Sequence, residues 1–424
     1  MKISNSDGEK RYGAILVGVV LDSHPLWEIK ESLEELSRLA DTAGYDTVEK
    51  VIQRTERFNP RYFIGSGKAE DLRSLVKDSN AEIVIFDNDL SPTQNRNIED
   101  LTGCCVLDRC GLILEIFRRH AKTREAKTQV ELAHLNYTLP RLTRRWGHLS
   151  RQRGGIGLRE VGETQIEIDR RLIRNRIAKL NRELKTIEKR KETQGKERKD
   201  IFTAAFVGYT NAGKSTLMNL LTDSNLLVED KLFATLDSTI RRLKNSFSPN
   251  ILITDTVGFI NKLPHSLIVS FKSTLDELRK AYLLMKVVDL SDHRFESHMN
   301  TIHNVLGELG LTNTPSLWVF NKIDCLTDKD LIPNLRDRYP GSVFTSGIKN
   351  IGIEELYDRI RSFFENTMVE GEVLINYANS KVISHIHVIA YVTKEEYLKD
   401  GVMINYKISK DKAGLIDVLR RERS

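Results

Sequence analysis

The sequence predicts a multidomain α/β protein with an amino-terminal α/β domain, an antiparallel helical hairpin, a second α/β domain with a doubly wound sheet, and a small carboxy-terminal α+β domain. Strand-like apolar runs alternate with amphipathic helical patterns up to about residue 115 and again from 201 to 367, which predicts parallel sheets. The section between them is helical and has no strand signal. At 424 residues, the chain is long enough for roughly two to four domains.

We place the domains at residues 1–118, 119–198, 199–367 and 368–424. In the first domain we expect strands at 14–21 and 81–88 and helices at 28–44 and 91–103. Gly44 ends the first helix, while Ser91 caps the second and Pro92 lies in its first turn. In the last domain the alternating runs 372–377, 387–392 and 402–408 predict strands.

The composition, 40% hydrophobic and 29% charged, is typical of a globular protein, and no apolar run approaches the roughly 18 residues of a membrane span. The amino terminus has no apolar signal region. We therefore expect a cytoplasmic monomer, with loose membrane association as the alternative. The four cysteines lack a CxxC pattern, and we expect them to be small buried residues: Cys104, Cys105, Cys110 and Cys325.

The hairpin is predicted from two helices. The first reaches Pro140, and the second runs from about Gln165 to Glu192, before a charged linker over 192–200. A narrow apolar seam with spacings of four and three indicates that the second helix packs on a partner: Ile173, Ile177, Leu180, Leu184 and Ile187. One long solvated helix with a charged face is the alternative.

A phosphate-binding loop follows the apolar strand "TAAFV", because "GYTNAGKS" satisfies GxxxxGKS at the start of a helix. The glycines let backbone amides surround the phosphates, Lys214 brings positive charge to the outer phosphates, and Ser215 ligates magnesium. The expected nucleotide-binding residues here are Gly208, Tyr209, Thr210, Asn211, Ala212, Gly213, Lys214, Ser215 and Thr216.

Three later segments identify the base and complete a P-loop GTPase domain. In "ILITDTVGF", Asp255 is expected to bind the magnesium indirectly, through a water ligand of the ion. The Gly258 amide is expected to donate a hydrogen bond to the terminal phosphate. "LWVFNKID" ends in Asn321, Lys322 and Asp324, and this carboxylate can accept two hydrogen bonds from guanine that adenine does not offer. "FTSGIKN" supplies a base-contacting loop at Ser346 and Gly347. The expected ligand is therefore GTP.

The catalytic set that we expect is Lys214, Thr235 and Gly258. Thr235, in "LFATLDSTIRR", is chosen as the second magnesium-ligating hydroxyl, with Thr239 as the alternative. Phe259 stands where many GTPases carry the glutamine that orients water. Asn211 at its P-loop position resembles GTPases that use a potassium ion beside the phosphates; the alternative is that Asn211 only closes the turn.

The chain resembles the HflX GTPases, which are associated with the large ribosomal subunit. The resemblance covers nearly the whole chain, through "YFIGSGKAEDL", "FDNDLSPTQNRNIED", "KTQVELAHLNYTLPRLT", "GETQIEIDRRLIRNRI", "GYTNAGKST" and "DTVGFI". It implies that the hairpin loop reaches ribosomal RNA of the large subunit, and that the GTP-bound protein splits or rescues stalled ribosomes. A GTPase that assists transfer-RNA modification or large-subunit assembly is the alternative, as is a purely structural RNA-binding protein. The use of ATP within the family is a further possibility. The NKID motif of this sequence argues against it, because that motif favours guanine.

Loop residues 140–165 suit RNA because six arginines against Glu160 and Glu163 give a net charge of +4, with aromatic rings among them. A solvated basic loop is the alternative. The expected RNA contacts are Arg141, Arg144, Arg145, Trp146, Arg151, Arg153 and Arg159.

The sequence departs from the family pattern at five positions. Leu158, Glu160 and Val161 replace a threonine, a glycine and a proline of the family loop, and the carboxylate is expected to weaken or redirect RNA contact. Ser238 replaces a proline and Gly347 an alanine.

Overall fold

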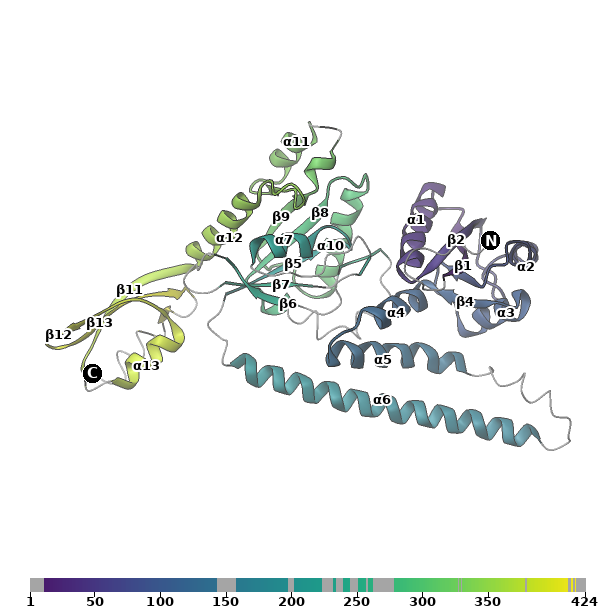
Figure 1. The fold of residues 1–424 in the computed structure, drawn as a ribbon, viewed down its shortest axis with the longest axis horizontal. Helices are drawn as coiled ribbons and strands as arrows, with labels where there is room; N and C mark the ends of the chain where they lie inside the picture. Colours follow the sequence, from purple (N-terminus) through teal and green to yellow (C-terminus); the bar gives the residue numbers. More distant parts are fainter. Residues whose placement is uncertain are drawn as a thin grey trace. The chain divides into compact units, whose positions relative to one another are not determined.

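The computed structural model describes residues 11–142, 158–196, 202–222, 232–233, 239–244, 251–256, 258–261, 278–326, 328, 330–377, 380–410, 413–414 and 416. The chain divides into two compact units. The first comprises Met1–Lys189 with Glu229–Asp237 and Lys262–Ser273, and the second comprises the rest. Figure 1 labels the elements, and the predicted mixed α/β architecture is confirmed.

A four-stranded parallel sheet of order β2-β1-β3-β4 organises the first unit. Helices α1 and α4 contact each other, and α2 and α3 pack beside the core formed by alternate residues of β1 and β3. The bounds are β1 (Tyr12–Leu21), α1 (Leu26–Thr42), β2 (Tyr45–Thr55), α2 (Ser66–Ser79), β3 (Ile83–Phe86), α3 (Pro92–Thr102), β4 (Cys105–Asp108) and α4 (Arg109–His120).

The start of α3 follows the predicted capping chemistry. Ser91 Oγ accepts a hydrogen bond from the Gln94 amide at 3.2 Å, and Gln94 Oε1 accepts one from the Ser91 amide at 3.0 Å. This reciprocal capping box, with Pro92 at the first position, fixes where the helix begins. Of the cysteines, Cys110 is buried, but Cys105 and Cys325 are exposed, so the expectation of burial was wrong for these two.

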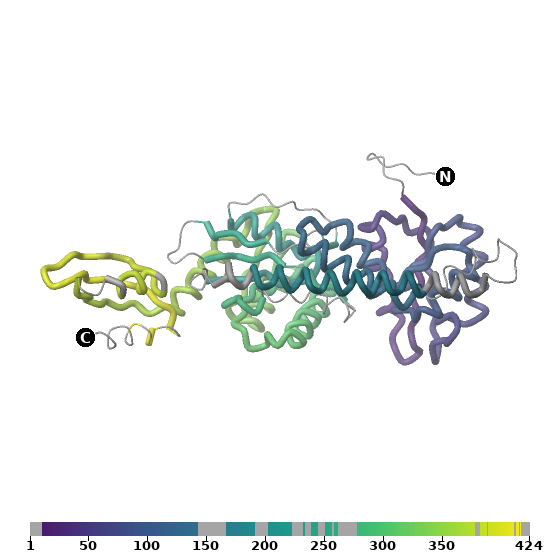
Figure 2. The backbone as a smooth tube through the Cα atoms, turned by 90° about the horizontal axis from the view of Figure 1, so that it is seen from below, coloured from purple at the N-terminus to yellow at the C-terminus, as the bar shows by residue number. Residues whose placement is uncertain are grey.

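The helical hairpin consists of α5 (Arg124–Thr138) and α6 (Leu158–Lys196), which lie side by side in Figures 1 and 2. Arg124 pairs with Glu183 at 2.7 Å, and Arg176 pairs with Glu131 through two contacts of 2.6 and 2.7 Å. Because later residues of α5 meet earlier residues of α6, the two helices are antiparallel, as predicted. Leu180 of the predicted seam is buried.

The second unit contains a six-stranded sheet of order β10-β9-β8-β5-β7-β6, parallel except for β6. Helices α7 and α12 share a buried core with alternate residues of β5, while α10 contacts β5 and β8. The bounds are β5 (Phe202–Gly208), α7 (Lys214–Leu221), β6 (Thr239–Arg242), β7 (Ile251–Asp255), β8 (Leu283–Asp289), α10 (Phe295–Glu308), β9 (Ser316–Asn321), α11 (Leu331–Arg338), β10 (Val343–Phe344) and α12 (Ile353–Thr367).

A small antiparallel sheet of order β11-β13-β12 follows, with α13 against it. Its elements are β11 (Met368–Ile375), α13 (Ser380–Ile389), β12 (Tyr391–Leu398) and β13 (Gly401–Ser409). The predicted strand over 387–392 was wrong for its first half, because residues up to Ile389 are helical and β12 begins at Tyr391. Val382 and Ile386 lie one helical turn apart and are buried in the core of this sheet, so the buried apolar face of α13 begins before the predicted run. Among the described helices, none is both long and apolar enough to span a membrane.

Candidate nucleotide site

The loop after β5 restricts the residue types at several of its positions, through close backbone contacts and through left-handed φ angles. A Cβ on Gly208 would lie 2.3 Å from the Val287 carbonyl oxygen, and a Cβ on Gly213 would lie 2.2 Å from Asn321 Nδ2. Gly213 also has φ +91°, and Asn211 has φ +61°, in the left-handed region that Gly and Asn tolerate best. The glycine pattern therefore reflects close packing of the loop as well as access to phosphate.

Lys214, at the start of α7, is buried, and its Nζ donates to the carbonyl oxygens of Gly208 at 3.1 Å and Tyr209 at 2.8 Å. Burial lowers the pKa of this ammonium to about 8, and the charge of Asp255 partly offsets the decrease. The side chain is thus held beneath the loop that would enclose the phosphates, in surroundings where an added anion would stabilise its charge.

Ser215 and Asp255 bring two hard oxygen donors together. Ser215 Oγ donates to Asp255 Oδ2 at 2.5 Å, and Asp255 is fully buried at the end of β7, next to the P-loop strand. Hydroxyl and carboxylate oxygens of this kind suit Mg²⁺ bound to nucleotide phosphates. The donor set therefore fits the predicted magnesium site.

Asn321 joins the P-loop to the last base loop. Its Nδ2 donates to the Ala212 carbonyl at 2.9 Å, and its Oδ1 accepts hydrogen bonds from Thr345 Oγ1 at 3.0 Å and from the Gly347 amide at 3.2 Å. Both the nitrogen and the oxygen of the Asn321 side-chain amide form hydrogen bonds, and the residue is buried. Asn321 thus fixes the separation between the two loops that are expected to hold the nucleotide.

The predicted base reader, Asp324, follows β9 in a short helical turn with Lys322 at its start. The Ser346 hydroxyl, through a hydrogen bond to this carboxylate, holds the pKa of Asp324 below its ordinary value. Lys322 Nζ forms an ion pair with Asp289 Oδ2 at 2.8 Å. The structure therefore brings together the NKID residues and the Ser346 loop, with Asp324 kept ionised as an acceptor.

The sequence matches known families along most of its length. Residues 30–118 match a GTP-binding GTPase amino-terminal model, residues 120–198 the corresponding middle-region model, and residues 203–322 a model described as 50S ribosome-binding GTPase. A GTPase HflX from Flavobacterium psychrophilum is 48% identical over 310 residues, covering 73% of this chain and 75% of that protein. A GTPase HflX from Escherichia coli is 40% identical over 374 residues, covering 88% of each.

The chain belongs to the HflX GTPase family. Like other members, it binds guanine nucleotide and hydrolyses GTP. It is also similar to the crystal structure of a GTP-binding protein from Sulfolobus solfataricus in complex with GDP, with 26% identity, a TM-score of 0.44, and coverage of 84% of this chain and 99% of that chain.

The terminal-phosphate segment of this HflX-family chain lies against the P-loop. A Cβ on Gly258 would be 2.8 Å from Thr210 Cα and 3.0 Å from Lys214 Nζ. Phe259 is only 2% exposed. Its ring is therefore part of the core, and it carries no atom that could form a hydrogen bond to water.

The switch residues are described only in part. Thr235 and Ser238 lie outside the described residues, whereas Thr239 begins β6 directly opposite Asp255 in the antiparallel ladder. Phe233, which belongs to the first unit, is buried, and its ring meets that of Phe117 edge-on at 4.8 Å between centroids.

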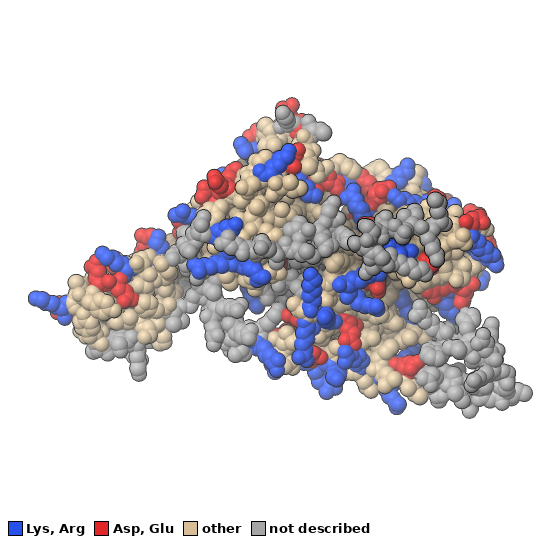
Figure 3. Space-filling model, in the orientation of Figure 1, with Lys and Arg blue, Asp and Glu red and all other residues tan. Residues whose placement is uncertain are grey.

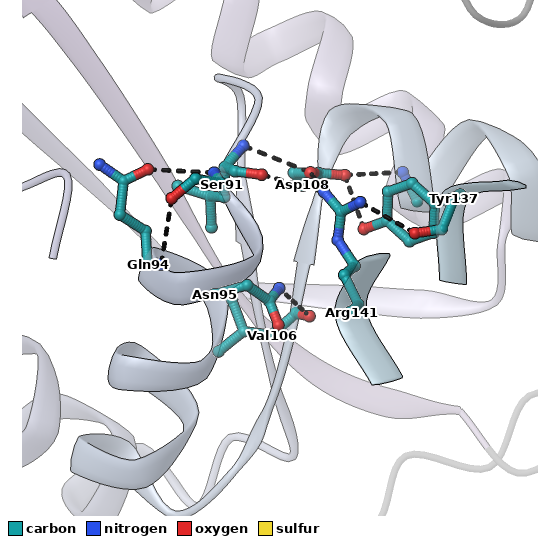
Figure 4. Close-up of polar contacts among 9 residues, drawn as sticks. Ser91, Gln94, Asn95, Val106, Asp108, Tyr137 and Arg141 are labelled. Carbon is teal, nitrogen blue, oxygen red and sulfur yellow. Dashed lines mark hydrogen bonds and ion pairs between the residues drawn. The ribbon is translucent and has the colours of Figure 1, made fainter. Parts of the chain in front are cut away.

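Arg141 lies in a buried polar network that the sequence did not reveal (Figure 4). Its guanidinium contacts Asp108 Oδ2 at 2.7 Å and the Leu90 carbonyl at 2.9 Å, and lies 3.7 Å from the centroid of the Tyr137 ring. The Tyr137 hydroxyl donates to Asp108 Oδ1 at 2.8 Å, while burial raises the pKa of Tyr137. Because Arg141 anchors the end of α5 to β4, we remove it from the proposed RNA contacts.

The other proposed RNA contacts fall at or beyond the start of α6. Residues 143–157, which include Arg144, Arg145, Trp146, Arg151 and Arg153, lie outside the described residues. Arg159 lies in the first turn of α6, because the helix begins at Leu158 rather than near Gln165. Glu160 and Val161 favour helix more than the glycine and proline of the family pattern, which accounts for the earlier start.

Proposed function

We propose that this HflX-family GTPase binds the large ribosomal subunit in its GTP form and splits or rescues stalled ribosomes. The observation that carries the proposal is the presence, in one chain, of P-loop and NKID residues brought together and of an antiparallel helical arm whose two helices are joined by a sequence rich in arginine. The match to a ribosome-binding GTPase family supports the partner.

The residues of the site have distinct roles in the proposed hydrolysis. Lys214 would compensate the charge of the outer phosphates, and the Gly258 amide would donate to the terminal phosphate. Ser215 would hold magnesium directly and Asp255 through water, with Thr235 as the second hydroxyl ligand. The magnesium would supply charge that stabilises the leaving phosphates. Asp324, kept ionised, would select guanine.

Asn211 is proposed as a potassium contact, because Phe259 is buried and the site needs another source of catalytic charge. Asn211 is exposed, which is compatible with contact to an ion beside the phosphates. A role in closing the turn, which its left-handed backbone also fits, is the competing interpretation.

The arm is suited to RNA beyond its loop. Basic side chains project from the described part of α6, with acidic side chains between them (Figure 3). Apart from Arg176, which pairs with Glu131, the exposed basic residues there include Arg171, Arg174, Lys179, Arg182 and Lys185. Such a surface would bind the phosphate backbone of RNA, while Trp146 and the arginines of the loop would contact unpaired nucleotides.

The test is GTP hydrolysis measured with purified large subunits, small subunits and transfer RNA in parallel. The proposal predicts stimulation by large subunits only, and loss of that stimulation when Arg144, Arg145, Arg151 and Arg153 are changed to Ala. A control variant removes the same charge from exposed positions of the first unit: Arg54, Arg57, Arg73 and Lys77. Stimulation by transfer RNA, or equal losses in the two variants, would favour the alternative functions.

A further inference from the structure

The Gly258 segment is attached to β5 on one side and to the P-loop on the other. Before it, Thr256 Oγ1 donates to the Phe206 carbonyl of β5 at 2.7 Å. After it, the Phe259 amide donates to the Gly208 carbonyl at 2.9 Å, and the Thr210 amide donates to the Phe259 carbonyl at 2.8 Å. Gly258 therefore lies between two anchored points of its segment, against Lys214.

A third anchor comes from the side chain of Tyr209. Its hydroxyl accepts a hydrogen bond from the Asn261 amide at 2.7 Å, which extends the attachment two residues beyond Phe259. The Tyr209 ring stacks on His298 of α10, with centroids 3.9 Å apart and an interplanar angle of 16°. Both side chains are buried, at 5% and 3% exposure, so the ring has little freedom to move.

Helix α10 supports the same segment from a second residue. Thr301 Oγ1 donates to Asn261 Oδ1 at 2.9 Å, three residues after His298 on the helix. The backbone of Asn261 is thus held by Tyr209, and its side chain by Thr301. Tyr209 belongs to the phosphate-binding loop, but its hydroxyl and the Thr301 hydroxyl are both engaged with Asn261.

We propose that Tyr209 is a positioning residue for GTP hydrolysis, whose hydroxyl holds the Asn261 backbone and so sets where the Gly258 amide meets the terminal phosphate. In GTPases with a glutamine after this glycine, a side chain can complete the water site. Here the Phe259 ring is buried, so the placement of this segment depends on its backbone attachments. The inference rests on the GTPase activity and is independent of the ribosomal partner.

Tyr209→Phe tests the role because it removes the hydroxyl and keeps the stacked ring. We expect kcat for GTP hydrolysis to decrease about two- to tenfold, the range expected for one hydrogen bond. GDP affinity should stay the same, because GDP lacks the phosphate that Gly258 would contact. Thr301→Val, which does not alter the P-loop, should also lower kcat, but by a smaller factor than Tyr209→Phe.

Tyr357→Phe is the matched control, because the Tyr357 hydroxyl also bonds to the backbone of the second unit, in this case as the donor to the Lys244 carbonyl at 3.3 Å. Its kcat should equal that of the unmodified protein. Unchanged kcat in Tyr209→Phe would overturn the proposal. Equal losses of GDP and GTP-analogue affinity would also overturn it, because they would indicate that the hydroxyl only shapes the P-loop.

Discussion

The burial of Lys214 predicts how nucleotide affinity varies with pH. Removal from water lowers the pKa of this ammonium to about 8, more than two units below its ordinary value. Phosphate charge favours the protonated form, so nucleotide should bind chiefly to protein whose Lys214 carries a proton. Affinity should therefore be constant well below pH 8 and decrease as the pH rises through that value.

The size of the decrease follows from the pKa. With a pKa of about 8, roughly nine-tenths of the protein is protonated at Lys214 at pH 7, and roughly one-tenth at pH 9. The affinity for GDP should thus decrease about tenfold over this interval, which corresponds to about 1.4 kcal/mol. Affinity must decrease rather than increase with pH, because desolvation lowers the pKa of Lys214 in the free protein and bound phosphate stabilises the charged lysine.

Calorimetry of GDP binding at pH 7, 8 and 9 measures this change and the uptake of a proton that accompanies it. Lys214→Met is the control, because it keeps an apolar chain of similar length without a titrating group. Its weaker affinity should vary only with the ionisation of GDP itself. The reasoning fails if the unmodified protein binds GDP equally well at pH 7 and 9, or if Lys214→Met shows the same decrease.

Three further predictions concern the base, the arm and the ion. Asp324→Asn should lower the preference for GTP over xanthosine triphosphate about ten- to hundredfold in a competition assay, because an amide oxygen accepts only part of the guanine pair; an unchanged ratio would exclude Asp324 as the base reader. Arg141→Ala should lower the free energy of unfolding of the first unit by about 3–5 kcal/mol in urea denaturation, since it leaves the buried Asp108 without its cation; a loss under about 1 kcal/mol would contradict this. GTP hydrolysis should be faster in potassium than in sodium at equal ionic strength if Asn211 contacts the ion, and equal rates would leave Asn211 as a turn residue.

Much of the fold could be predicted because local chemistry specified it. The Ser91 cap with Gln94, the apolar strand before the P-loop and the seam around Leu180 each fix an element through neighbouring residues. β2 has no such signal, since it lies at the edge of its sheet and its residues, other than the buried Val51, are intermediate or exposed. The run 387–392 spans the end of α13 and the start of β12, a boundary that apolar periodicity alone does not locate.

The residues of the site also divide into those that the sequence predicts and those whose contacts only the structure reveals. Lys214, Ser215, Asp255 and Asn321 were predictable because motif spacing assigns their roles, and the structure brings them together. The contacts of Arg141 could not be predicted, because its partner Asp108 lies 33 positions earlier and only folding makes them neighbours. The same is true of Tyr209, whose ring partner, His298, belongs to α10.

Cosedimentation with purified ribosomal subunits tests the central proposal most directly. The protein should pellet with large subunits in the presence of a non-hydrolysable GTP analogue and remain in the supernatant with GDP. The four-arginine loop variant should remain in the supernatant with either nucleotide. Equal binding with both nucleotides, equal binding to small subunits, or full binding by the loop variant would contradict a GTP-controlled arm that recognises the large subunit.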